Sequence, residues 1–109
     1  MKFEYAAIML LLFTTPAFPD SKTDNGVEVE CKLTGSGDSG FDITGDNKQG
    51  SADRSCKASC RVTKADKSTM EKSYDSKTVR KGFKAWLGGK AGVSGAPLKN
   101  PTVTSASCK

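Results

Sequence analysis

The side chains best suited to binding chemistry lie close together between residues 77 and 90. Cationic side chains attract anionic groups, and aromatic rings placed among them can stack on a base or a sugar. We therefore predict an anion-binding site here. The alternative is that the aromatic residues belong to the core and the lysines only solvate the domain. The cations are Lys77, Arg80, Lys81, Lys84 and Lys90, and the two candidate stacking residues are Phe83 and Trp86.

The distribution of charge along the chain also favours a basic binding surface. The chain has 17 Lys and Arg residues against 12 Asp and Glu residues, which gives a net charge of +5. Residues 20–53 have a net charge of −5, whereas residues 54–109 have one of +10. A basic half can attract polysaccharide, phospholipid head groups or nucleic acid. The expected partner is therefore an anionic polymer or a membrane surface.

Catalytic side chains are poorly represented. The chain has no histidine, which is the usual proton carrier of serine and cysteine nucleophiles and of RNA cleavage. Carboxylate chemistry is what remains, but no sequence pattern brings two acids together across a cleft. We therefore predict no catalytic residue and no enzyme activity, and a small hydrolase is the last of three functional hypotheses.

Cofactor and metal motifs are incomplete. Gly35 to Gly40 has the spacing G-x-G-x-x-G, but a dinucleotide site needs a helix directly after it, and Phe41 to Thr44 alternates like a strand. A four-cysteine zinc site usually uses two close pairs, whereas Cys31 and Cys108 stand alone and the chain has no histidine. Asp38, Asp42 and Asp46 are four residues apart, whereas a calcium loop needs acids at alternate positions. We predict neither a cofactor nor a metal ion.

The four cysteines predict two disulfides, because an even count in a small exported domain usually forms a disulfide framework. Cys56 and Cys60 are four residues apart, so on one strand they point to the same side and are too distant to pair. The favoured connectivity is Cys31–Cys56 with Cys60–Cys108. Its alternative is Cys31–Cys60 with Cys56–Cys108.

The first 19 residues have the pattern of a secretory signal peptide. Lys2 supplies a positive charge, residues 6–13 are an unbroken apolar run, and small residues follow. Cleavage is expected after Ala17 or after Pro19. The apolar run is shorter than the roughly 18 residues that a membrane-spanning helix needs. The remaining residues, 20–109, are predicted to form one small, secreted, disulfide-bonded β domain in an extracellular or periplasmic location.

Several segments alternate between apolar and polar residues with the period of a β-strand. Residues 27–34 are the clearest strand, and residues 55–74 predict a hairpin that turns at Asp66 and Ser68, both turn-forming residues. Shorter strands are predicted at 41–44 and 102–108. Residues 45–53 and 88–101 are predicted loops. The predicted fold is therefore mainly β: a single antiparallel sheet or a sandwich, held by two disulfides.

The segment 76–87 fits two structures. As a helix it would place Val79, Phe83, Trp86 and Leu87 on one face and end at the glycines that follow. As strands it would use Gly82 as a bend, because glycine costs a helix interior about 1 kcal/mol. A strand is favoured, and a short helix over 76–87 is the alternative.

Together these features predict an exported binding protein, monomeric, with a basic face for an anionic partner. The alternative is a secreted toxin or antimicrobial protein that acts on another cell. That function would need an exposed apolar patch beside the lysines, which only Phe83, Trp86 and Leu87 could supply.

Overall fold

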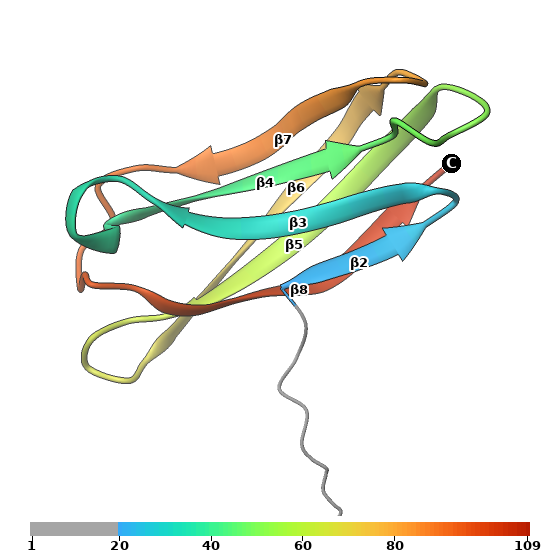
Figure 1. The fold of residues 1–109 in the computed structure, drawn as a ribbon. Coiled ribbons are helices and arrows are strands. Elements are labelled where there is room, and N and C mark those ends of the chain that lie inside the picture. The colour runs from blue at the N-terminus through green and yellow to red at the C-terminus, as the bar shows by residue number, and fades with distance from the viewer. Residues whose placement is uncertain (1–19) are drawn as a thin grey trace, which may run out of the picture.

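The computed structural model describes residues 20–109, which form two antiparallel β-sheets packed face to face (Figure 1). One sheet has the strand order β2-β3-β4-β7 and lies in front in Figure 1; the other has the order β6-β5-β8. The predicted mainly β fold is confirmed, whereas the predicted signal peptide, residues 1–19, lies outside the described residues. The strands are β2 (Ser21–Asp24), β3 (Val27–Thr34), β4 (Gly40–Asp46), β5 (Arg54–Thr63), β6 (Thr69–Val79), β7 (Lys84–Lys90) and β8 (Lys99–Cys108), with a 3-10 turn, η2 (Ser36–Asp38), between β3 and β4.

The core lies between the sheets and is built from alternate residues of the strands, as period two requires. On β3, Val27, Val29 and Cys31 are buried while the residues between them face outward. On β4, Phe41 and Ile43 are buried. The inward face of β5 consists of Cys56, Ala58, Cys60 and Val62.

The predicted hairpin is confirmed as β5 and β6, with Val62 opposite Met70 and Ala58 opposite Tyr74. Asp66 closes its turn, because its Oδ1 accepts hydrogen bonds from the Ser68 backbone at 2.9 Å and from the Ser68 hydroxyl at 2.5 Å. These bonds hold the pKa of Asp66 below its usual value. The β6 strand is an edge strand of its sheet.

The helix considered for 76–87 is wrong, since this segment is the end of β6, a turn and the start of β7. Gly82 has a φ of +84°, a left-handed conformation that no right-handed helix contains. The apolar residues that would have shared a helix face are divided: Val79 and Leu87 are buried, whereas Phe83 and Trp86 face the solvent. Phe83 belongs to neither strand, because it lies in the turn between them.

Other boundaries also differ from the sequence prediction. Gly45 and Asp46, predicted to begin a loop, are the last residues of β4. The loop predicted for 88–101 is shorter, because β7 continues to Lys90 and β8 begins at Lys99. The strand β2 was not predicted at all. It pairs with β3 through a tight turn in which Asn25 and Gly26 have φ angles of +48° and +80°, as Asn-Gly turns of β-hairpins do.

The favoured disulfide pairing is also wrong, and its alternative is the one present. Cys31 on β3 pairs with Cys60 on β5 across the two sheets, with Cα atoms 6.2 Å apart. Cys56 and Cys108 lie directly opposite each other on β5 and β8 and pair at a Cα distance of 4.0 Å. Because β8 runs antiparallel to β5, the end of β8 meets the beginning of β5, which places Cys108 beside Cys56 and not beside Cys60.

One open side of the sandwich is closed by hydrogen bonds between β8 and the β2–β3 turn. The Cys108 backbone N–H donates to Asp24 Oδ2 at 2.7 Å, and Asn25 Nδ2 donates to the Cys108 carbonyl. The second open side lies between β6 and β7, which carry the candidate site. Among residues 20–109 there is no helix long and apolar enough to span a bilayer.

Candidate anion-binding surface

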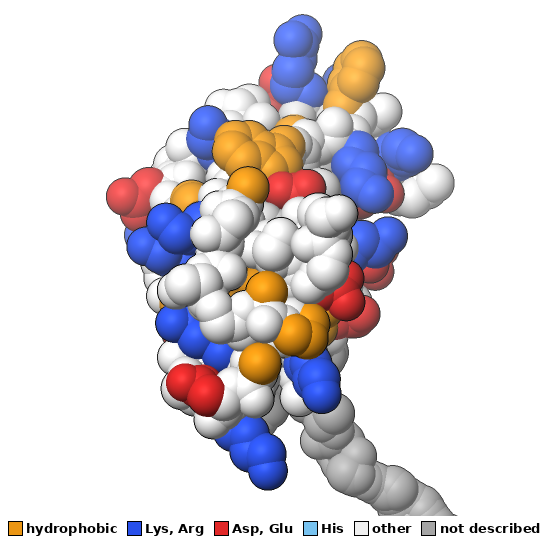
Figure 2. Space-filling view, turned by 90° about the vertical axis from the view of Figure 1, so that its left-hand side faces the viewer, with side chains coloured by type: hydrophobic (Ala, Val, Ile, Leu, Met, Phe, Trp, Pro, Cys, Tyr) orange, Lys and Arg blue, Asp and Glu red, His pale blue; other side chains and the backbone are white. Residues whose placement is uncertain are grey.

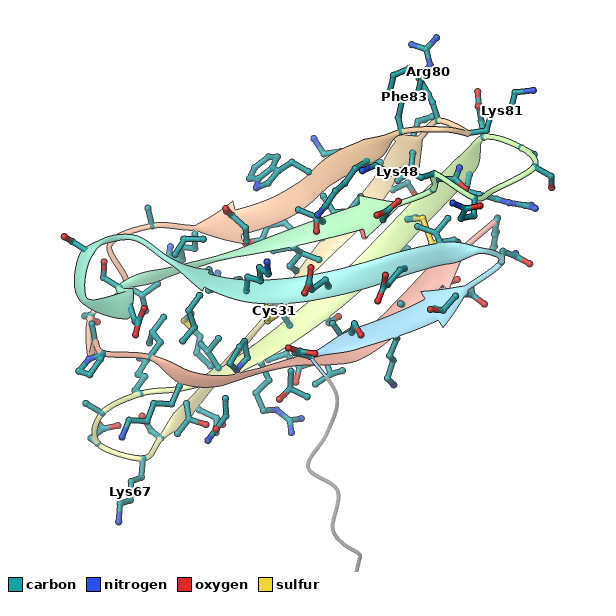
Figure 3. All side chains as sticks on the ribbon, in the orientation of Figure 1. Cys31, Lys48, Lys67, Arg80, Lys81 and Phe83 are labelled. Carbon is teal, nitrogen blue, oxygen red and sulfur yellow. A yellow bond between two sulfur atoms is a disulfide. The ribbon has the colours of Figure 1, made fainter. Side chains whose placement is uncertain are left out.

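Most of the predicted binding residues come together where the chain crosses from one sheet to the other, at the end of β6, the turn 80–83 and the start of β7. This connection doubles back like a hairpin, although β6 and β7 are not paired with each other. The aromatic residues are exposed there: 63% of the Phe83 surface and 55% of the Trp86 surface are accessible, and no other large hydrophobic residue among the described ones is exposed. Figure 3 shows Arg80, Lys81 and Phe83 projecting from the turn, away from the sandwich. We call this set the hairpin surface; it consists of Lys77, Arg80, Lys81, Phe83, Lys84 and Trp86, all exposed.

Lys90 is not part of the hairpin surface. It is the last residue of β7 and lies opposite Phe41, whereas Lys84 is the first residue of β7 and lies opposite Asp46. Six residues of extended strand separate Lys84 from Lys90 by about 20 Å. The structure thus brings together four of the five predicted cations and leaves the fifth at the other end of the strand.

The turn of the hairpin is held by Asn47, a fully buried residue. Its backbone accepts a hydrogen bond from the Gly82 N–H at 2.9 Å and donates one to the Phe83 carbonyl at 2.8 Å. Its side chain donates to the Val79 carbonyl at 2.9 Å and to the Ala52 carbonyl at 3.0 Å. These bonds join the loop after β4 to the turn on both sides of Gly82.

A second contact from the same loop supports the turn. Asp53 Oδ1 accepts a hydrogen bond from the Lys81 backbone N–H at 3.0 Å. The Lys81 side chain is not used in this bond and remains exposed. The cations of the turn therefore stand on an anchored backbone, which lowers the conformational entropy that ligand binding would have to remove.

Trp86 is fixed on the outer face of β7 by its neighbours. Its indole Nε1–H donates to Asp42 Oδ1 on β4 at 3.2 Å. The Lys77 ammonium, from β6, lies 5.8 Å from the centroid of its ring, within the range of a cation–π interaction. Both contacts restrict the orientation of the ring while more than half of its surface stays accessible.

Two glycines of β7 make this arrangement sterically possible. A Cβ atom on Gly89 would lie 2.6 Å from Asp42 Oδ1, so only glycine leaves room for the carboxylate that holds Trp86. On the inner side, a Cβ atom on Gly88 would lie 2.4 Å from the ring of Tyr74. The Tyr74 hydroxyl donates to the Gly89 carbonyl at 2.9 Å and so ties β6 to β7. Partial burial raises the pKa of this phenol.

The hairpin surface borders an acidic face. The outward residues of β3 and β4 include four carboxylates and, as a cation, Lys32. Figure 2 shows hydrophobic side chains at the surface with basic and acidic side chains next to them. The four carboxylates are Glu28, Glu30, Asp42 and Asp46.

A shallow hollow lies beside this face, with a volume of about 190 Å³. Pockets for drug-sized ligands have volumes of about 300–1,000 Å³. The hollow is therefore too small for such a ligand, and we assign no ligand to it. Its lining residues are Gly26, Glu28, Asp46, Lys48 and Gln49.

Comparison of the chain with protein-family models, with curated proteins and with solved structures finds no significant match.

Sequence reasoning missed three residues that shape the site. Asp42 and Asn47 were taken as loop or surface residues, and Tyr74 only as an apolar strand residue. Their roles depend on which strands lie side by side, since β4 and β7 are more than 35 residues apart in the chain. The one available signal was Gly88-Gly89, which marks a close approach when it occurs within a strand.

Proposed function

We propose that this chain is an exported binding protein whose hairpin surface holds an anionic polymer. The observation that carries the proposal is the exposure of Phe83 and Trp86 among four cations. A domain of this size has a small core, and burying a Phe side chain stabilises a protein by about 1.5–3 kcal/mol. Large aromatic residues that stay in solvent beside cations are typical of interaction surfaces.

Export is part of the proposal and has separate support. Two disulfides are consistent with an oxidising compartment, because cytosolic thiols are kept reduced. The apolar run at residues 6–13 also supports export, because it has the pattern of a signal peptide. Mass spectrometry of the natural protein should find a chain that begins at residue 18 or 20 and has no free thiol.

The binding proposal is tested by retention on a heparin column. The triple variant Arg80→Glu, Lys81→Glu and Lys84→Glu should elute at clearly lower salt than the wild-type protein, because it replaces three cations of the hairpin surface. Both proteins should unfold at similar temperatures, since all three side chains are exposed.

A matched control changes the same number of charges elsewhere. The variant Lys57→Glu, Lys72→Glu and Lys99→Glu alters three exposed lysines of the β6-β5-β8 sheet that lie outside the hairpin surface. It should lose much less retention than the hairpin variant. Equal losses would show that net charge alone governs retention and would refute a binding site on the hairpin.

A second candidate function is action on a membrane as a toxin or antimicrobial protein. The position of Phe83 favours it, because this exposed ring projects from a turn between Arg80 and Lys84 and could enter the head-group region of an anionic bilayer. Release of a dye from phosphatidylglycerol vesicles at submicromolar protein, lost in Phe83→Ala, would support this candidate. Intact vesicles at the same concentration would exclude it.

A further inference from the structure

We propose that the anionic polymer is an acidic polysaccharide and that one of its sugar rings packs on Trp86. This inference rests on the proposed function and narrows its ligand to one chemical class. It follows from the position of Trp86, which lies between the acidic face of the front sheet and the cations of the hairpin turn.

The strand register defines what surrounds Trp86. Thr44 lies directly opposite Trp86, and Glu30 lies directly opposite Thr44, so these three residues form a row across β7, β4 and β3. A parallel row beside it contains Asp42 and Lys32. Neighbouring strands are about 4.8 Å apart and same-face residues along a strand about 6.6 Å, so a single sugar ring on Trp86 would reach both rows.

The carboxylates of this face select for a ligand that donates hydrogen bonds. Ionised Glu30 and Asp42 are acceptors only, and Asp42 still has acceptor capacity after its bond to Trp86. Sugar hydroxyls can donate to these oxygens. The phosphates of a nucleic acid cannot, and they place one charge about every 3.4 Å along each strand, which the acidic face would repel. A nucleic acid therefore fits this face poorly.

The cations on the other side of Trp86 select for an acidic ligand. Lys77 lies over the ring, and Lys84 is the next outward residue of β7. Arg80 and Lys81 continue the basic surface onto the turn. A polymer that combines hydroxyl-rich rings with carboxylate or sulfate groups can satisfy both sides at once.

The orientation of the Trp86 indole is fixed before a sugar ring binds. The Asp42 hydrogen bond fixes the indole, and Gly89 gives the carboxylate its space. A fixed aromatic ring offers a flat apolar surface to the C–H face of a sugar at little entropic cost. The contrasting residue is Phe83, which no hydrogen bond can orient and which stands on the turn.

The test uses Trp86 itself, because it is the only tryptophan in the chain. Its fluorescence is recorded while the disulfide-bonded protein is titrated with oligogalacturonate, with oligo(dT) of the same number of charges, and with phosphatidylglycerol vesicles. We expect a saturable change with oligogalacturonate at a concentration at least tenfold lower than with oligo(dT). A tighter fluorescence response to oligo(dT) or to vesicles would overturn the polysaccharide assignment.

Calorimetry with variants checks the role of the ring. Trp86→Ala should weaken oligogalacturonate binding at least tenfold, Trp86→Phe less, and Phe83→Ala less than threefold. Equal effects of Trp86→Ala and Phe83→Ala would overturn the inference. If oligo(dT) binds through Arg80, Lys81 and Lys84 while oligogalacturonate does not bind, the inference is wrong and the proposed function stands. If no polyanion binds, both are wrong.

Discussion

At the scale of single residues, the site depends on side chains that hold the hairpin surface in place as well as on its cations. Asp42 orients Trp86 through a 3.2 Å hydrogen bond, and Gly89 makes room for it. Tyr74 supports β7 from the inner side, where its ring packs against Gly88 and its hydroxyl donates a hydrogen bond to the Gly89 carbonyl. β7 is therefore clamped from both faces just after Trp86.

Tyr74 gives the first prediction, which concerns pH. Its pKa is raised in the folded protein because burial disfavours the phenolate. Above a pH of about 10, the phenol loses its proton in the unfolded state but keeps it in the folded state. The contribution of Tyr74 to the free energy of unfolding is therefore complete below that pH, and it is lost as the pH rises through the pKa of the folded state. Urea unfolding should show a steeper alkaline loss of stability in the wild type than in Tyr74→Phe. Parallel curves would contradict this role of Tyr74.

At the scale of elements, the β6–β7 hairpin is positioned by the loop after β4. Asn47 binds Gly82 and Phe83 through its backbone and Val79 through its side chain. Asp53 adds the contact to the Lys81 N–H. The hairpin surface therefore depends on a buried residue that is not itself one of the predicted binding residues.

Asn47→Ala should destabilise the protein by about 1–3 kcal/mol, because it leaves the buried Val79 carbonyl without its side-chain donor and also removes the bond to the Ala52 carbonyl. It should also weaken heparin retention, since the turn loses an anchor. Chemical denaturation measures the first effect and chromatography the second. Gln49→Ala, an exposed neighbour in the same loop, is the control and should change neither. If Asn47→Ala were as stable as the wild-type protein, the turn would not depend on the Asn47 side chain.

The strands that the sequence predicts well are those with the clearest alternation. Residues 27–34 and most of β5 alternate, so the pattern identifies their inward faces, although a bulge between Cys56 and Ala58 interrupts β5. The segment 76–87 could not be assigned, because its apolar residues serve two purposes: Leu87 fills the core while Trp86 beside it faces the solvent. β2 has no apolar pattern, and only its Asn25-Gly26 turn could have revealed it.

At the scale of the whole molecule, the two disulfides have different roles. Cys31–Cys60 joins the two sheets, whereas Cys56–Cys108 joins neighbouring strands of one sheet. The sequence predicts that four cysteines pair, but the partners depend on which strand lies beside β5. In the same way, the change from acidic to basic residues along the chain can be counted from the sequence. The contact between the acidic and basic surfaces at Trp86 follows only from the pairing of β7 with β4 at the edge of the front sheet.

Each disulfide should contribute about 4 kcal/mol in the chain-entropy treatment, since the pairs are 29 and 52 residues apart. The variant Cys31→Ser with Cys60→Ser should also loosen the packing of the sheets, which dye binding to exposed apolar surface would detect. The variant Cys56→Ser with Cys108→Ser should affect mainly the end of β8. Peptide mapping that finds Cys31 linked to Cys56 would contradict this description of the core.

NMR chemical-shift mapping can show whether the ligand binds at the hairpin surface. Amide signals of the protein would be followed during titration with a heparin oligosaccharide. We expect the largest shifts at residues 77–86 and at Asp42, with little change around Lys57 and Lys99. Shifts spread evenly over the exposed lysines, or concentrated on the β5–β8 face, would contradict this expectation.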